Sequence, residues 1–176
     1  MHNYVTVEGW YVRRGINLRP ILYGGRQERG LRSGTENVPA IAGFAAALTL
    51  CAKLREKEST RLAKLRDYFI RKLLTLPDTI LNGSVTARLP NNINVSFIHA
   101  DSEFVVLNLD AHGVLAASGS ACSAHEKPAS HVITALGGLA ENAVRFTLGR
   151  ETKKGDLDYV LKILPDILKR APEGGL

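Results

Sequence analysis

The feature that most constrains the fold is an alternation of strand and helix patterns in the second half of the chain. Short runs of strand length lie around Leu81, at residues 94–98, around Leu115 and at residues 144–148. Segments with helical spacing separate these runs. Alternating strands and helices indicate an α/β layer structure. Further upstream, residues 9–15 predict one more strand that ends at a turn.

Capping residues mark where the intervening helices begin and end. Asp101 or Ser102 can cap a helix that Gly113 ends, and Ser130 can cap a helix that Gly137 ends. A last helix follows residue 153, and Pro165 inside it should kink or split that helix.

An apolar helix precedes the alternating part. Asn37 can cap it, and residues 40–51 are apolar on nearly every side, a pattern typical of a buried helix. We therefore expect Cys51 to be structural. The polar residues 55–59 predict a break before the next, amphipathic helix, so we place a domain boundary at about residue 55.

Composition excludes several classes of protein. Hydrophobic residues make up 45% of the 176, charged residues 23% and aromatic residues 6%. The net charge of +6 is concentrated in the first half, but no aromatic residues interleave with the arginines as a base-stacking platform would require, which argues against a nucleic-acid partner. We find no run long and apolar enough to span a membrane and therefore expect no membrane partner.

Two cysteines cannot form a disulfide framework, and the first residues lack the basic and apolar regions of a signal peptide, so we expect a cytoplasmic protein. Cys122 lies among small residues at 117–125, which read as a loop between a strand and a helix. A loop can bring a reactive thiol to a substrate. The alternative is that Cys122 is a small buried apolar residue.

Four motifs resemble those of the cysteine desulfurases, pyridoxal-phosphate enzymes of the class V aminotransferase family. Residues 118–123, Ser-Gly-Ser-Ala-Cys-Ser, resemble the active-site cysteine loop. Residues 29–37, 92–97 and 144–150 resemble further motifs, in the same order and with similar spacing. The resemblance implies the C-terminal part of a fold-type I enzyme of the α/β class. Residues 1–55 would be the remnant of the large cofactor-binding domain, and residues 56–176 the small C-terminal domain with the cysteine loop.

The resemblance also implies an activity. Such an enzyme takes sulfur from L-cysteine as a persulfide on the residue that matches Cys122, releases alanine, and passes the sulfur to an acceptor or scaffold protein for iron–sulfur cluster assembly or tRNA thiolation. The cofactor is pyridoxal 5'-phosphate. Its Schiff-base lysine normally follows a histidine, and none of the five histidines here precedes a lysine. We therefore expect this chain to be inactive alone.

Two further residues receive roles from the resemblance. Thr35 matches the threonine that donates to the cofactor phosphate of the partner subunit, which implies a homodimer. From composition alone, the Gly- and Arg-rich loop before Thr35 could equally be a solvated basic loop. Arg145 matches the arginine that binds the substrate carboxylate, with Arg150 as a weaker candidate. From its strand context alone, Arg145 could instead form an internal salt bridge.

The sequence is compatible with two other interpretations, a metal site and a protein without catalysis. Cys122 and His125 have the spacing of half a zinc site, with His131 as a possible third ligand, but no second cysteine pair exists and we expect no metal. The function could also be that of a catalytically inactive sulfur-carrier pseudoenzyme, with Cys122 accepting sulfur made elsewhere, or of a dimerisation module.

Overall fold

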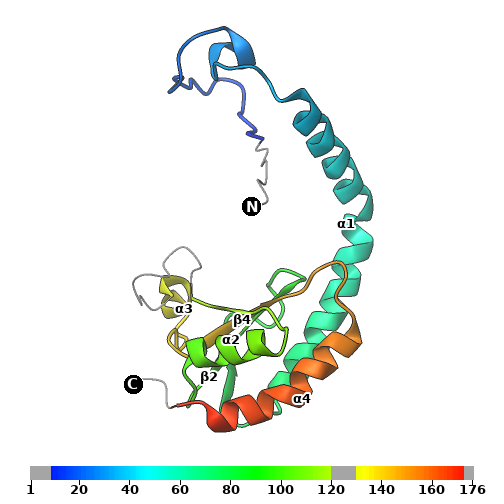
Figure 1. Cartoon of the computed structure of the whole chain (residues 1–176), viewed down its shortest axis with the longest axis vertical. Helices are drawn as coiled ribbons and strands as arrows, with labels where there is room; N and C mark the ends of the chain where they lie inside the picture. Colours follow the sequence, from blue (N-terminus) through cyan, green and yellow to red (C-terminus); the bar gives the residue numbers. More distant parts are fainter. Residues whose placement is uncertain (1–8, 120–129, 173–176) are drawn as a thin grey trace. The chain divides into compact units, whose positions relative to one another are not determined.

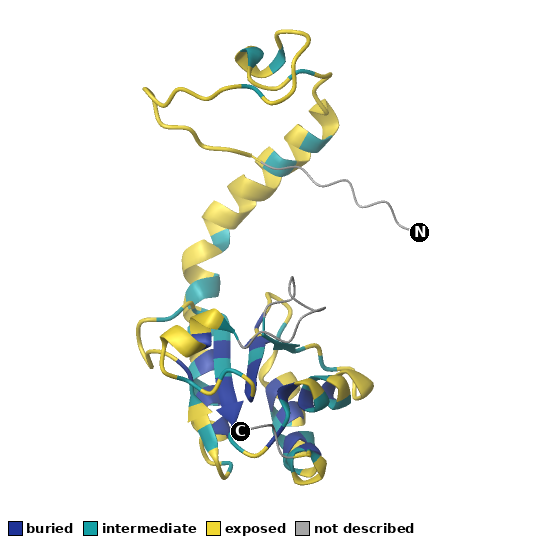
Figure 2. Cartoon of the chain, turned by 90° about the vertical axis from the view of Figure 1, so that its left-hand side faces the viewer, coloured by how far each residue is buried: buried dark blue, intermediate teal, exposed yellow. Residues whose placement is uncertain are grey.

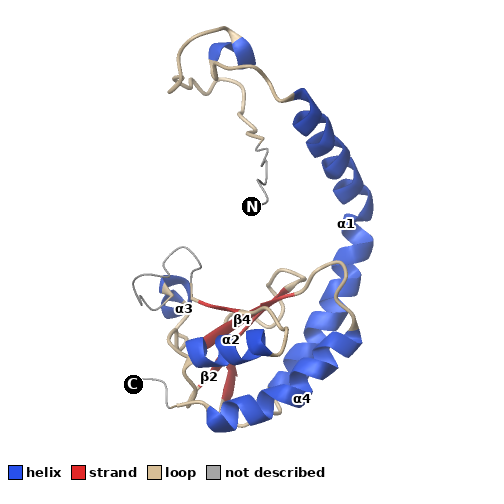
Figure 3. Ribbon diagram, viewed as in Figure 1, coloured by secondary structure: helices blue, strands red, loops and turns tan. Residues whose placement is uncertain are grey.

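The computed structural model describes residues 9–119 and 130–172. Two compact units make up the chain, residues 1–55 and residues 56–176. The elements in chain order (Figures 1 and 3) are η1 Gln27–Gly30, α1 Val38–Leu73, β1 Thr79–Leu81, β2 Asn92–Phe97, α2 Ser102–Ala111, β3 Ala117–Ser118, α3 His131–Ala135, β4 Ala143–Thr147 and α4 Lys154–Arg170. The α/β class expected from the sequence is confirmed.

The first unit contains little regular structure ahead of α1. Its residues 9–26 form no strand, so the strand expected at residues 9–15 is wrong. A strand needs a pairing partner for its backbone groups, and no other strand is formed among the described residues of this unit. Hydrogen bonds tie residues 24–34 together locally: the Ser33 hydroxyl donates to the Gly25 carbonyl at 3.0 Å.

Helix α1 is a single continuous helix that contains the boundary between the two units. Its start is as expected, because the Asn37 side chain accepts a hydrogen bond from the Ala40 N–H at 3.2 Å. The break expected at residues 55–59 does not occur. That stretch contains no glycine or proline, and arginine, glutamate and lysine are good helix formers, so polarity alone does not interrupt the helix.

The apolar first half of α1 is exposed, which contradicts the burial expected from its sequence (Figure 2). Cys51 is exposed as well, and none of the described residues 9–55 is buried. By length and composition, α1 also qualifies as a helix that could cross a membrane, so the expectation that no segment qualifies is wrong. A core helix of a soluble protein passes the same test, so this observation is weak ground for a membrane.

The second unit is built on a four-stranded antiparallel sheet in the order β1-β2-β4-β3. Successive side chains of a strand point to opposite faces. The apolar face of β2 and β4 carries Ile93, Val95, Phe97, Val144 and Phe146, all buried. The opposite face carries polar residues: Asn92, Asn94, Ser96, Arg145 and Thr147.

Helices α2 and α4 and the end of α1 cover the apolar face. Phe69 of α1 meets Phe146 of β4 edge to face, with ring centroids 5.3 Å apart. Leu109 of α2 and Leu164 of α4 complete this core and are fully buried. Pro165 does not split α4, which continues to Arg170. One backbone hydrogen bond is absent at the proline, but the buried apolar face of the helix runs through it.

Candidate functional site

Cys122 and His125 lie outside the described residues, so their expected roles stay predictions. The described residues on either side of residues 120–129 belong to ordered elements of the second unit. Ser118 of β3 pairs with Val144 of β4. On the other side, the Ser130 hydroxyl accepts from the Ile133 N–H at 3.5 Å and caps α3, as expected. The segment that contains Cys122 is therefore flanked on both sides by ordered elements of the second unit.

Arg145 lies in β4 between two neighbouring strands. It pairs with Asn94 of β2 on one side and with Ala117 of β3 on the other. Its side chain is partly buried, on the polar face of the sheet. Within residues 9–119 and 130–172, its guanidinium forms no ion pair or hydrogen bond. The internal salt bridge that the sequence left open is therefore not formed within this part of the chain, and the charge can bind an anion.

A buried hydrogen-bond network lies beside Arg145 on the same face. The Asn82 Nδ2 donates to Asn94 Oδ1 at 2.7 Å and to Ser96 Oγ at 2.8 Å. Ser96 Oγ in turn lies 2.8 Å from the Leu139 carbonyl oxygen. We did not assign these residues from the sequence. The available signal was the Asn-x-Asn-x-Ser alternation at residues 92–96, which puts three polar side chains on one face of a strand.

Arg150, the weaker carboxylate candidate, is placed differently. It lies in the exposed turn after β4, and its Nε is 3.2 Å from Glu151 Oε1. Arg61 of α1 fixes this turn by donating to the carbonyls of Arg150 and Thr152, each at 2.7 Å. Arg150 already has an anionic neighbour, whereas Arg145 has none in the described chain, so Arg145 is the better candidate.

Thr35 lies in the first unit, two residues before the cap of α1, and is exposed. Its hydroxyl forms no hydrogen bond within the described ranges. Gly34 has a φ of +116°, a conformation that L side chains rarely adopt. The neighbouring Arg32 is exposed too. A free hydroxyl beside a guanidinium and a glycine fits a phosphate oxygen, so these residues can contribute to a phosphate site.

The described chain contains eight lysines. All eight are exposed: Lys53, Lys57, Lys64, Lys72, Lys153, Lys154, Lys162 and Lys169. A hydrogen bond from Lys154 to Asp158, and a further contact with Tyr68, raise the pKa of Lys154. A lysine that forms a Schiff base needs the opposite, a desolvated amine with a lowered pKa.

Metal ligation finds no support in the described residues, which contain no group of three or more potential ligands that could hold an ion. His131, the possible third ligand of a zinc site, is exposed at the start of α3.

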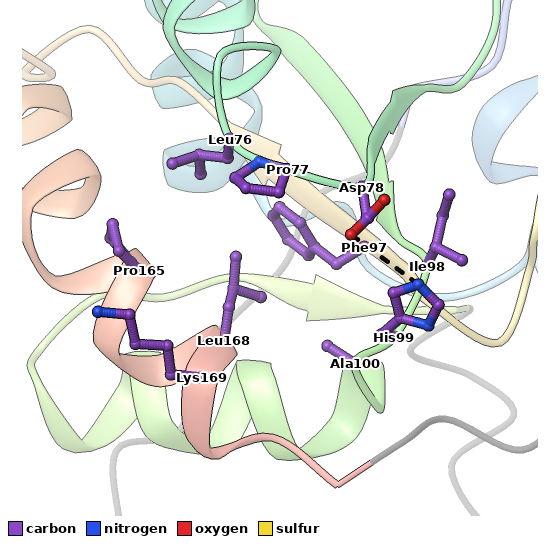
Figure 4. Close-up of a pocket in the computed structure, with 10 residues that line it drawn as sticks. All are labelled: Leu76, Pro77, Asp78, Phe97, Ile98, His99, Ala100, Pro165, Leu168 and Lys169. Carbon is purple, nitrogen blue, oxygen red and sulfur yellow. Dashed lines mark ion pairs between the residues drawn. The ribbon is translucent and has the colours of Figure 1, made fainter.

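A surface cavity of about 240 Å³ lies at the far end of β2 (Figure 4). Its lining is mostly apolar, with Phe97 and Leu168 among the contributors. At its rim, His99 Nε2 is 3.9 Å from Asp78 Oδ2. Neither Arg145 nor Arg150 lines this cavity.

Comparisons with known proteins identify relatives of this chain. The Aminotransferase class-V family matches residues 11–160. Cysteine desulfurase IscS 1 of Archaeoglobus fulgidus is 45% identical over 163 residues, which are 91% of this chain and 43% of that protein. Cysteine desulfurase IscS of Dictyoglomus turgidum is 44% identical over 164 residues, 91% of this chain and 42% of that protein.

Solved structures of two NifS-like proteins are similar to this chain. A NifS-like protein superposes with a TM-score of 0.79 at 31% identity, covering 90% of this chain and 41% of its own. The NifS-like protein of Rickettsia africae gives 0.76 at 28% identity, covering 88% of this chain and 41% of its own. The chain thus spans about two fifths of the length of these relatives. The fold-type I class expected from the sequence is confirmed, and the chain belongs to the class-V aminotransferase family, as a homologue of the cysteine desulfurases.

Proposed function

We propose that this chain supplies the substrate-binding arginine and the sulfur-accepting cysteine of a cysteine desulfurase. The observation that carries the proposal is the guanidinium of Arg145, which has no partner among the described residues and lies half-buried on β4, in a strand position opposite Ala117. Cys122 follows Ala117 by five residues. Covalent geometry alone keeps Cys122 within about 18 Å of Ala117. The carboxylate-binding group and the nucleophile therefore belong to one small unit.

The reaction we propose moves one sulfur atom. Arg145 binds the carboxylate of L-cysteine in a bidentate contact and orients the substrate thiol. The Cys122 thiolate attacks the substrate sulfur, so that a sulfur–sulfur bond forms and the substrate Cβ–S bond breaks. The products are alanine and a persulfide on Cys122, and a sulfur-acceptor or scaffold protein removes the persulfide sulfur. By family resemblance, the acceptor serves iron–sulfur cluster assembly or tRNA thiolation. The lack of a disulfide framework supports a cytoplasmic location.

Pyridoxal phosphate, when bound, supplies the electron sink that makes the Cβ–S bond labile. Thr35, whose hydroxyl has no hydrogen-bond partner among the described residues, would donate to the cofactor phosphate of a partner subunit, which makes the working protein a homodimer. The lysines of the described chain are all exposed, which supports the expectation that the Schiff-base lysine is not among them. We propose that another segment provides that lysine and that this chain is inactive alone.

The test is complementation. The chain is mixed with the part of the Archaeoglobus fulgidus relative that lies before the region matching this chain; the matching region itself is 45% identical. Alanine formation from L-cysteine is measured with pyridoxal phosphate present. We expect alanine from the mixture and none from either part alone. Arg145→Gln should raise the KM for L-cysteine at least tenfold by removing a charge-assisted contact, whereas Arg150→Gln should not. Alanine from this chain alone, or equal KM values in both variants, would contradict the proposal.

A further inference from the structure

Asn94 and Arg145 lie directly opposite each other on β2 and β4. In this ladder the Phe97 N–H donates to the Asn142 carbonyl at 3.1 Å. Along an antiparallel ladder, hydrogen-bonded pairs alternate with non-hydrogen-bonded pairs. The Phe97–Asn142 pair is hydrogen-bonded, and Asn94 lies an odd number of positions, three, before Phe97. Asn94 and Arg145 therefore form a non-hydrogen-bonded pair, in which the Cα atoms are only about 4.5 Å apart and the side chains rise close together from one face.

The hydrogen bond between Ser96 and the Leu139 carbonyl shows, through Asn82, whether the oxygen or the nitrogen of the Asn94 side-chain amide is already bonded. The Leu139 carbonyl oxygen can only accept, so the Ser96 hydroxyl, 2.8 Å away, must donate to it. Ser96 Oγ must then accept from its other neighbour, at 2.8 Å, which identifies that atom as the donating Nδ2 of Asn82.

The same Nδ2 lies 2.7 Å from the Asn94 side chain, so the atom it meets there is the acceptor Oδ1. The Nδ2 group of Asn94, with its two N–H donors, is left over. It forms no hydrogen bond within the residues that the structure describes. Asn94 therefore presents donors on the same face as the guanidinium of Arg145, which is unpaired in the described part of the chain.

We propose that the Asn94 amide is a second hydrogen-bond donor for the carboxylate that Arg145 binds. This rests on the proposed function of Arg145. A carboxylate has about four lone-pair sites, and a bidentate guanidinium occupies two of them, so an adjacent amide finds a free acceptor. A neutral second donor adds no charge, which keeps the site matched to a single carboxylate.

The buried network has a further role in this arrangement. Asn82 and Ser96 are 6% and 0% exposed, and Asn82 Oδ1 has no hydrogen-bond partner in the described structure. Leaving a buried acceptor unpaired is unfavourable. The network leaves this one acceptor unpaired, but its other hydrogen bonds hold the amide of Asn94 in one orientation. Asn82 and Ser96 are thus positioning residues, and Asn94 is the residue that touches the substrate.

The test uses the 176-residue chain, labelled with 15N, and follows side-chain NMR signals. L-alanine, the proposed product, supplies the carboxylate, and ethylamine serves as the matched probe that lacks it. The Asn94 Nδ2–H and Arg145 Nε–H signals should shift together with L-alanine, giving one dissociation constant, and should not shift with ethylamine. Asn94→Leu, which keeps the size and removes the donors, should weaken L-alanine binding about five- to tenfold.

Asn92 provides the control. It lies on the same face of β2, opposite Thr147, so Asn92→Leu makes the same chemical change two positions away and should leave the dissociation constant unchanged. If Arg145 responds to L-alanine and Asn94 does not, or if both leucine variants bind equally well, the role of Asn94 is wrong and that of Arg145 stands. If Arg145 itself does not respond, the proposed function fails as well.

Discussion

Arg61 of α1 donates a hydrogen bond of 2.7 Å to the carbonyl oxygen of Thr152, 91 positions further along the chain. It also donates to the carbonyl of Arg150 at 2.7 Å, while Glu58 accepts from it at 3.0 Å. These bonds tie the turn after β4 to the helix that packs beneath the sheet. The end of the strand that carries Arg145 is thereby anchored.

Arg61→Met should therefore destabilise the second unit. Hydrogen bonds from a charged donor contribute about 2 kcal/mol, and the turn carbonyls lose that donor, so the free energy of unfolding should fall by about 2 kcal/mol in urea denaturation. Arg71→Met is the control on the same helix, because Arg71 is exposed. It should change the free energy of unfolding by less than about 0.5 kcal/mol. Equal losses in the two variants would show that the turn does not depend on Arg61.

Gly138 has no room for a side chain. A Cβ there would meet Asn82 Oδ1 at 2.5 Å and Ile133 Cγ2 at 2.8 Å. Gly138→Ala should lower the free energy of unfolding by about 1–3 kcal/mol through overpacking. It should also displace Asn82 and so release the amide of Asn94, which NMR would report as a shift of the Asn94 Nδ2 signal.

Gly155 gives the matched control for that substitution. It lies in the first turn of α4, and a Cβ there would meet nothing within 4 Å. Gly155→Ala should keep the protein's stability or raise it by up to about 1 kcal/mol, because alanine is the better helix former. A loss at Gly155 as large as the loss at Gly138 would argue against the steric explanation.

Periodic apolar patterns and caps predicted most of the second unit correctly. The strands around Leu81, at residues 94–98 and at residues 144–148 are present as β1, β2 and β4, and Asp101 caps α2 through the Phe104 N–H at 2.8 Å. These features are local, so a single sequence carries them. The strand predicted around Leu115 was placed less accurately, because only Ala117 and Ser118 pair with β4.

The predictions that were wrong or incomplete concerned properties that depend on what surrounds a segment. The apolar residues 40–51 predicted burial, yet burial requires covering elements, and the described first unit supplies none. In the candidate site, Arg145 could be named from the sequence, but its pairing with Asn94 depends on the register of β2 and β4. Register is a long-range property that no local pattern revealed here.

The pH dependence of stability should include a contribution from Asp158. A hydrogen bond from Lys154 at 2.7 Å, and another from Tyr68, hold the pKa of Asp158 below its usual value of about 3.9. A lowered pKa means that the stabilisation is complete above that usual value and is lost as the pH falls through the folded-state pKa. Asp158→Asn should therefore be less stable than the unmodified chain at pH 7, and the difference should close below about pH 4.

Lys154→Met tests the cause of that shift. Lys154 is the main hydrogen-bond donor to Asp158. Without it, the loss of stability between pH 7 and pH 2, measured by thermal unfolding, should be smaller than in the unmodified chain. A difference between Asp158→Asn and the unmodified chain that stays constant down to pH 2 would contradict the assignment.

The exposed apolar residues of α1 should drive self-association. Ile41 and Leu48 are 43% and 55% exposed, and exposed apolar residues gathered on one helix normally mark a contact with another protein. Sedimentation should show a dimer that Leu48→Glu weakens at least tenfold. Val85→Glu, at an exposed apolar residue of the second unit, should have no effect. A well-behaved monomer at high concentration would count against the homodimer.

The most direct test of the account is to locate the transferred sulfur. The complemented mixture is given L-cysteine, persulfides are labelled by selective alkylation, and the peptides are mapped by mass spectrometry. Cys51 is exposed, so it is available to the label as well. We predict a persulfide on Cys122 and none on Cys51, with the label lost in Cys122→Ala and retained in Cys51→Ala. Equal labelling in the Cys122→Ala variant would contradict the account.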